Sequence, residues 1–156
     1  MGLMAFLRGM IFRPRALQTG VICLREGPEG YEVLLVRTLD TGRWIIPKGW
    51  PMDGKTLAEA AEIEAWEEAG AKGRMMPEEF ARIPSNKRRN GGLEVPTDLA
   101  IFVMTGTELL DDYPEAGKRE RRMWPIDLAA RRADVDALGE VITALSERLG
   151  GAPPQG

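Results

Sequence analysis

The sequence predicts a single α/β domain. Segments with the composition of β-strands alternate with two segments that carry helical patterns, and neither an internal repeat nor a linker divides the chain. A chain of 156 residues can bury about 70% of its unfolded surface, which is enough for one substantial core. Hydrophobic residues make up 44% and charged residues 29%, a composition that excludes a fibrous or generally disordered protein.

The predicted strands are short runs bounded by turn-forming residues. Five runs rich in apolar residues predict strands at 19–24, 32–36, 44–46, 80–83 and 99–104, and a sixth strand is expected at 121–124. The first two runs flank the turn-rich segment 26–30 and therefore predict a hairpin. Run 99–104 is apolar throughout, as expected of a central strand. The polar and basic stretch 85–92 is expected to be a loop.

Two segments predict helices. Residues 56–69 contain no Gly or Pro, Thr56 stands three residues before Glu59 in the spacing of a capping box, and Gly70 supplies a stop. Residues 135–149 have apolar side chains at helical spacing, so one face is expected to be buried. The apolar positions are Val135, Leu138, Val141, Ile142, Leu145 and Leu149.

Charge and residue types exclude several classes of protein. The 21 Lys and Arg against 24 Asp and Glu give a formal charge of -3, so nucleic-acid binding through overall charge is not expected. The chain has no histidine, which excludes Ser-His-Asp and Cys-His triads and imidazole zinc sites. Acid–base or metal chemistry therefore falls to carboxylates, Lys, Tyr or Cys.

The single cysteine and the two termini bear on location and partners. Cys23 cannot form an internal disulfide and lies in an apolar run, so it is expected in the core, in a reducing, cytoplasmic setting. The apolar N-terminal segment 1–15 is broken by Arg8 and Gly9 and lacks the features of a signal peptide. It is expected to pack on the domain or on a partner subunit, which leaves a homodimer open. No run reaches the roughly 18 apolar residues of a membrane span, and residues 150–156 are expected to be a flexible tail.

Three glutamates in the first predicted helix indicate a cation site. Residues three and four apart share a helix face, so Glu64 meets Glu67 and Glu68 over one turn. Like charges at this spacing cost about 0.2–0.5 kcal/mol per pair, a cost that a bound cation would offset. Hard oxygen ligands without imidazole or thiolate favour Mg²⁺ or Mn²⁺ over zinc. The alternative is a solvated acidic face, to which Glu59 and Glu62 would also belong.

The segment 49–71 resembles the signature of the Nudix hydrolases, in which a glycine precedes a helix with a fixed pattern of glutamates. The matching spacings are occupied by Gly49, Glu64, Ala65, Glu67, Glu68 and Gly70. The likeness extends through the early hairpin, the apolar strand 99–104 and the strand before the last helix. It implies a Nudix-type α/β/α sandwich with a mixed β-sheet, formed by a Nudix hydrolase domain at 16–149.

Two residues depart from the family pattern inside the signature. Lys55 stands where the family has its first glutamate, and Ile63 stands where it has the arginine that helps to orient the motif carboxylates. The hypothesis is that this supporting pair was replaced as a unit, by an apolar contact at Ile63 and a cation at Lys55. Because supporting partners of metal ligands can be worth about 10- to 100-fold in affinity or activity, the departures put the rate in doubt while leaving metal binding plausible.

The resemblance implies metal-assisted attack of water on phosphorus, with Mg²⁺ or Mn²⁺ as the cofactor. The substrate would be a nucleoside or other diphosphate linked to a further group. By motif position, Glu64 and Glu68 would be metal ligands, Glu67 a further ligand or the base, and the Gly49 carbonyl an extra oxygen ligand.

A base outside the signature is also usual in such enzymes. Glu120, which precedes the last predicted strand, is expected in this role. The alternative for Glu120 is a surface glutamate that pairs with Arg119 or Arg122.

Basic groups on this otherwise acidic chain indicate a substrate rich in phosphate. The residues expected to grip phosphate are Lys48, Lys87, Arg88, Arg89, Lys118 and Arg119. An ordinary solvated loop is the alternative for 87–89. Within the family, Pro47-Lys48-Gly49 and the basic stretch before Trp124 look most like the diphosphoinositol-polyphosphate and diadenosine-polyphosphate hydrolase branch. A polyphosphorylated small molecule is therefore the expected substrate.

Two other functions stay open at this point. Lys55 and Ile63 are compatible with a degenerate Nudix domain that binds a phosphorylated ligand with little or no hydrolysis. An RNA 5′-end pyrophosphohydrolase would need a path for a longer strand, and the net negative charge argues against it.

Overall fold

The computed structural model describes residues 15–85, 87–88 and 94–150. In this part of the chain, eight strands form one sheet and two short strands, β7 (Lys87–Arg88) and β8 (Glu94–Val95), pair separately. The strands of the main sheet are β1 (Ala16–Gly27), β2 (Gly30–Arg37), β3 (Trp44–Ile45), β4 (Lys48–Gly49), β5 (Ala71–Met75), β6 (Ala81–Pro84), β9 (Thr97–Leu109) and β10 (Arg121–Pro125). The described helices are α2 (Leu57–Ala69), α3 (Ile126–Arg132) and α4 (Asp136–Gly150).

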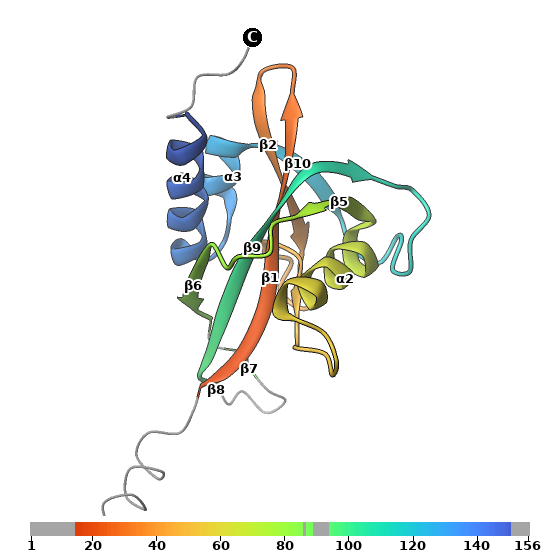
Figure 1. Ribbon diagram of the computed structural model, residues 1–156, viewed down its shortest axis with the longest axis vertical. Helices are drawn as coiled ribbons and strands as arrows, with labels where there is room; N and C mark the ends of the chain where they lie inside the picture. The colour runs from red at the N-terminus through yellow and green to blue at the C-terminus, as the bar shows by residue number, and fades with distance from the viewer. Residues whose placement is uncertain (1–14, 86, 89–93, 151–156) are drawn as a thin grey trace, which may run out of the picture.

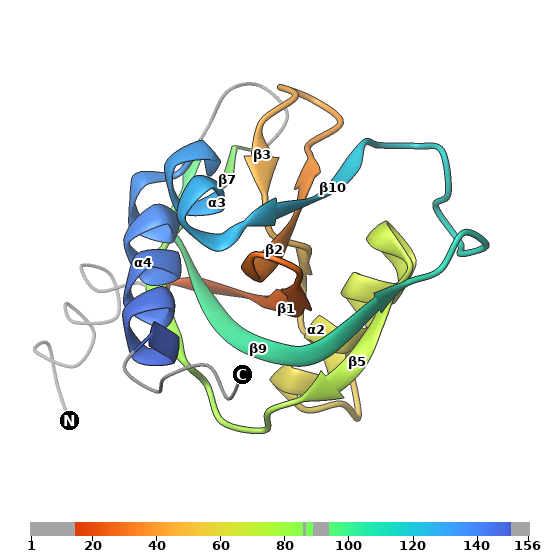
Figure 2. The ribbon, with the colours of Figure 1, turned by 90° about the horizontal axis from the view of Figure 1, so that it is seen from above.

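The sheet is mixed, as predicted. Its main path runs β10-β2-β1-β9-β5, with β3, β4 and β6 paired to β2, β1 and β9. The β1–β9 pair is parallel and the other pairs are antiparallel. Strands β1 and β2 form the predicted hairpin, with Gly27 opposite Gly30 at its end. Helix α2 lies on one side of the sheet and helices α3 and α4 on the other (Figures 1 and 2), which confirms the α/β/α sandwich.

The core lies between these layers and is supplied mainly by β1, β2 and β9. Ile22, Leu34, Ile101 and Met104 have no exposed surface. Cys23 is equally buried, and burial raises the pKa of its thiol to about 12. The expectation that Cys23 is a core residue is therefore confirmed, since a thiol that stays protonated is a poor nucleophile.

The sequence patterns missed strands β4, β5, β7 and β8 and helix α3. Strand β5 has a polar, mostly exposed sequence at the edge of the sheet, so it carries little apolar signal. Helix α3 buries only Ala129, which leaves no amphipathic repeat to detect. Strand β4 has two residues, and β7 lies inside the stretch that was expected to be a loop. Such short elements form because a neighbouring strand provides hydrogen-bond partners, which a local sequence pattern does not reveal.

Helix α2 lies close to the sheet because its buried residues are small. They are Ala60, Ala61, Ala65 and Ala69. The predicted capping box between Thr56 and Glu59 is present, and Gly70 ends the helix in the left-handed conformation, with φ 63°. The Thr19 hydroxyl on β1 also donates to the Leu57 carbonyl, at 2.8 Å. The helix that carries the motif glutamates is thus held at both ends and along its length.

Some expectations fall on parts that the structure does not describe. The N-terminal segment 1–15 and the tail 150–156 lie almost wholly outside the described residues. Within the described ranges, no helix is long and apolar enough to cross a membrane.

Candidate active site

The acidic face of α2 brings two of its glutamates into direct contact. Glu64 and Glu68 share a hydrogen bond between their side chains, while Glu67 affects Glu64 only through its charge. Among the described residues, no group of three acidic side chains is arranged as a ready metal site. Of the three carboxylates that were predicted to converge, Glu64 and Glu68 form a close pair and Glu67 lies nearby. At about 100° per residue, position 68 lies about 40° from position 64 around the helix and position 67 about 60° away on the other side.

Gly49 lies directly against this pair. Strand β4 pairs with β1, where Gly49 is opposite Thr19, and this pairing brings the Gly49 backbone to α2. A Cβ at position 49 would overlap the Glu64 carboxylate. Glycine is thus required at position 49 because the main chain and the carboxylate share the same space, as the motif spacing suggested.

Burial and crowding of like charges raise the pKa of both paired glutamates. For Glu64 the main cause is partial burial; the hydrogen bond with Glu68 opposes it, and the charge of Glu67 adds to it. The pKa of Glu68 is raised to about 8, first by burial, against the opposing charge of Arg119 and with the help of Glu64. The pair therefore holds a proton near neutral pH when no other cation is present.

The segment between β9 and β10 is attached to the C-terminal end of α2. The Leu110 amide donates to the Gly70 carbonyl at 2.8 Å, and the Glu115 amide donates to the Glu67 carbonyl at 3.1 Å. The Arg121 guanidinium donates to the Ala69 and Leu110 carbonyls, both at 2.7 Å. These bonds satisfy carbonyls at the helix end and fix the segment beside the acidic face.

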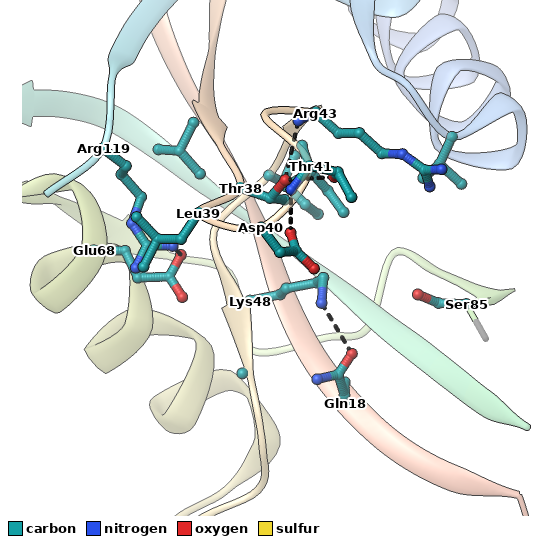
Figure 3. Close-up of a pocket in the computed structure, with 15 residues that line it drawn as sticks. Gln18, Thr38, Leu39, Asp40, Thr41, Arg43, Lys48, Glu68, Ser85 and Arg119 are labelled. Carbon is teal, nitrogen blue, oxygen red and sulfur yellow. Dashed lines mark hydrogen bonds and ion pairs between the residues drawn. The ribbon is translucent and has the colours of Figure 1, made fainter. Parts of the chain in front are cut away.

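This attachment places Arg119 next to the glutamate pair. Arg119 Nη2 lies 2.7 Å from Glu115 Oε1, and Nη1 lies 3.9 Å from Glu68 Oε2. Figure 3 shows Arg119 and Glu68 side by side at the edge of the pocket. A positive charge from one loop thus faces a negative pair on the helix.

The pocket beside the pair has a volume of about 480 Å³. Its polar side chains include Lys48, whose ammonium donates to the Gln18 amide oxygen at 3.1 Å (Figure 3). The lining residues are Gln18, Val36, Thr38, Leu39, Asp40, Thr41, Arg43, Ile45, Ile46, Lys48, Gly49, Glu68, Ser85, Arg119 and Val135. The pocket therefore combines basic groups near the glutamates with an apolar part formed by β2, β3 and the loop between them.

The structure brings together some of the predicted site residues and separates others. Lys48, Gly49, Glu68 and Arg119 all line the pocket. Glu120 does not face the pair; it is 55% exposed and pairs with Arg37 at 3.4 Å, because it lies at the start of β10 next to the end of β2.

The remaining predicted phosphate ligands are Lys118, Lys87, Arg88 and Arg89. Lys118 is exposed and does not line the pocket. Lys87 and Arg88 form strand β7, and Ser85, just before it, is the nearest described lining residue in sequence. Arg89 lies outside the described residues.

The sequence analysis missed Gln18, Arg43 and Glu115. The sequence offered one signal for Gln18, a long polar side chain next to an apolar run. In the structure this side chain is 1% exposed. Glu115 stands four residues before Arg119, a spacing that suits an ion pair in one helical turn. This spacing does not indicate the contact of Glu115 with helix α2, whose Glu67 stands 48 residues earlier in the chain.

The donor set fits a divalent cation. Two partly buried carboxylates provide hard oxygen ligands, and they lie next to the Gly49 backbone on β4, where a Cβ would overlap the Glu64 carboxylate. A divalent cation would also replace the shared proton and relieve the repulsion between Glu64 and Glu68.

Comparisons with known sequences match this arrangement. A family model for the NUDIX domain matches residues 14–145. The diphosphoinositol polyphosphate phosphohydrolase 3-beta of Bos taurus is 28% identical over 149 residues, which cover 93% of this chain and 84% of that protein. Nudix hydrolase 12, mitochondrial, of Arabidopsis thaliana is 39% identical over 98 residues, which cover 58% of this chain and 46% of that protein.

Solved structures share the fold. The crystal structure of the C. elegans Ap4A hydrolase aligns with a TM-score of 0.61 at 18% identity and covers 87% of this chain and 99% of that one. The NUDIX domain of Shewanella oneidensis NrtR, complexed with ADP ribose, also aligns with a TM-score of 0.61, at 15% identity, and covers 96% of this chain and 99% of that one. At these identities the likeness concerns the fold.

Proposed function

Because the chain belongs to the Nudix family, we propose that it is a metal-dependent hydrolase that cleaves a phosphoanhydride bond in a polyphosphorylated small molecule. One observation carries the proposal: Glu68, which pairs with Glu64, lines the pocket that Lys48 and Arg119 also line. Carboxylates that hold a cation and basic groups that hold phosphate are the two requirements of phosphoryl transfer in water.

Each residue has a role in the proposal. Glu64, Glu68 and the Gly49 carbonyl would hold Mg²⁺ or Mn²⁺, with Glu67 as a further ligand or the base. When bound, the metal neutralises phosphate charge and lowers the pKa of water. Lys48, whose ammonium donates a hydrogen bond to the Gln18 side chain, would bind a phosphate as a point charge.

The pocket favours a substrate that carries an organic group as well as phosphates. Leu39 is 63% exposed at the pocket, and Val135 is partly exposed there. An apolar face beside basic groups suits a nucleoside portion next to a phosphate chain. Nucleoside and dinucleoside polyphosphates are therefore proposed first. Diphosphoinositol polyphosphates follow, because a curated relative that covers most of the chain carries that name.

The test is cleavage of a substrate panel with Mg²⁺. The panel contains dinucleoside polyphosphates, diphosphoinositol polyphosphates, nucleoside diphosphate sugars and nucleoside triphosphates, with products separated by ion-exchange chromatography. Wild-type protein should cleave at least one class. Glu68→Gln should lower the rate on the order of 100-fold or more, since even the loss of a supporting partner costs about 10- to 100-fold. Glu62→Gln, an exposed change on the same helix, should leave the rate unchanged.

A second candidate is a domain that binds a phosphorylated ligand without cleaving it. Two observations favour it: Lys55 is exposed, and Ile63 faces a separate hollow of about 250 Å³ that includes Trp66 and Lys72. Neither residue supports the glutamates as the family's pair would. Thermal stabilisation by a polyphosphate, with Mg²⁺ bound and no product from any panel member, would establish this candidate and refute hydrolysis.

A further inference from the structure

Arg119 is held in an unusual position for a basic residue on a loop. Its side chain is only 14% exposed, and it is fixed by Glu115 at 2.7 Å and by Glu68 at 3.9 Å. Among the described residues its Nε finds no hydrogen-bond partner, although it is buried. Leaving a buried donor unpaired is unfavourable, so the contacts with Glu115 and Glu68 offset that cost.

The loop that carries Arg119 is attached to the C-terminal end of α2. Hydrogen bonds from Leu110, Glu115 and Arg121 attach the loop to the last turn of the helix. The Arg121 guanidinium also lies 4.7 Å from the centroid of the Tyr113 ring, which packs against Gly70. Arg119 and Glu68 are therefore presented by two segments that behave as one unit.

The acidic side chains around Glu68 repel one another, and a positive charge nearby offsets this repulsion. Glu68 and Glu115 both lie beside Arg119, whose guanidinium nitrogens are 3.9 Å from Glu68 Oε2 and 2.7 Å from Glu115 Oε1. At position 63, where the family signature has an arginine, the isoleucine faces Trp66 and Lys72 instead. The guanidinium beside Glu68 therefore comes from the loop and not from the helix.

We infer that Arg119 is a positioning residue, which, anchored by Glu115, holds the Glu68 carboxylate in the orientation that binds the metal and so performs the task of the absent arginine at position 63. The two distances fit this role. The short contact is with Glu115, so the guanidinium borders Glu68 at a distance and leaves its oxygens free for a cation. The inference rests on the proposed metal site, and it assigns Arg119 to the carboxylate rather than to phosphate.

The test is the affinity for Mn²⁺ without substrate, measured by electron paramagnetic resonance of free Mn²⁺. Arg119→Gln should weaken binding about 10- to 100-fold, as the loss of a supporting partner does. Charge alone predicts the opposite sign, because removing a positive charge near a cation site strengthens cation binding. Arg119→Lys keeps the positive charge but loses the paired donors of the guanidinium. Its Mn²⁺ affinity should lie between those of the wild-type protein and Arg119→Gln. Unchanged or tighter Mn²⁺ binding by Arg119→Gln overturns the inference.

The control is Arg74→Gln, which removes an exposed arginine on β5 and should leave the affinity unchanged. The melting temperature in EDTA verifies that each variant is folded. If Arg119→Gln does not fold, Arg119→Lys and Glu115→Gln carry the test, and both should weaken Mn²⁺ binding; normal binding by both overturns the inference.

A double-variant cycle separates positioning from a direct role of Glu115. Glu115→Gln in the Arg119→Gln background should add little further loss, because Glu115 acts through Arg119. Fully additive losses contradict this. The proposed hydrolysis fails separately: wild-type protein that binds Mn²⁺ but cleaves no panel member refutes hydrolysis, while the Mn²⁺ comparison still decides the role of Arg119.

Discussion

Helices α2 and α4 cover opposite sides of the same sheet, yet they bury different side chains. The buried residues of α2 are alanines at 60, 61, 65 and 69, whereas those of α4 include Leu138, Val141, Ile142 and Leu145. Burying a large aliphatic side chain contributes about 1.5–3 kcal/mol, and an alanine contributes far less. Helix α4 therefore supplies stability through packing volume.

Helix α2 instead uses small residues to reach the sheet, and this closeness is what brings its glutamates to Gly49. The same helix carries like charges that oppose folding when no metal is bound. The comparison indicates that one helix stabilises the sandwich and the other trades stability for a binding site. Three variants, taken from the largest expected effect on stability to the smallest, and one pH condition test this division.

Ile142→Ala should cause the largest loss of stability, because it removes a fully buried side chain from α4 and leaves a cavity. The expected decrease in the free energy of unfolding is about 2–5 kcal/mol, measured by urea denaturation. The rate per folded molecule and the Mn²⁺ affinity should stay at the wild-type values. A selective loss of Mn²⁺ affinity in the folded variant would break the division between the helices.

Ala65→Leu should lower stability by about 1–3 kcal/mol through overpacking under α2. Unlike the change in α4, it should also weaken Mn²⁺ binding, because α2 can only accommodate a larger residue by moving Glu64 away from Gly49. Urea denaturation and Mn²⁺ titration of the same preparation measure both effects. Normal Mn²⁺ binding would show that the close approach of α2 is not needed for the site.

Thr56→Ala removes the N-cap of α2 and should cost about 1 kcal/mol of stability. Its effect on Mn²⁺ affinity should be small, since the cap lies at the opposite end of the helix from Glu68. Thr56→Ser keeps the cap oxygen and serves as the control. If Thr56→Ala weakened Mn²⁺ binding as much as Ala65→Leu does, the prediction would be wrong, because loss of the N-cap would then disturb the helix as far as Glu64 and Glu68.

The fourth test is a pH dependence of stability that belongs to α2. The pKa of Glu68 is raised from its ordinary value of 4.5 to about 8, so the folded protein binds more protons than the unfolded chain between these values. The free energy of unfolding in EDTA should therefore fall as pH rises from about 4.5 to 8. Thermal melts across this range should show a shallower slope for Glu68→Gln and with Mg²⁺ present. An equal slope in all three cases would contradict the prediction.

Local patterns identified the features of each helix that depend on neighbours in sequence. Thr56, Glu59 and Gly70 mark the ends of α2 by capping rules, and the apolar repeat of α4 marks its buried face. The spacing from Gly49 to Glu68 was readable for the same reason, since residues four apart on a helix meet whatever the fold. Edge strand β5 and helix α3 escaped detection because they depend on tertiary neighbours more than on their own composition.

The amino-acid sequence by itself determined the layered α/β domain, the acidic helix and the lack of histidine or disulfide chemistry, because these follow from composition and from spacings of a few residues. Only the tertiary structure decided which charges meet those glutamates. Arg121 contacts a carbonyl 52 residues earlier, and this contact places Arg119 and Glu115 beside α2 while Glu120 pairs with Arg37. Such contacts depend on the path of the chain between β9 and β10. The order of charges in the sequence does not show that the adjacent residues Arg119 and Glu120 have different partners.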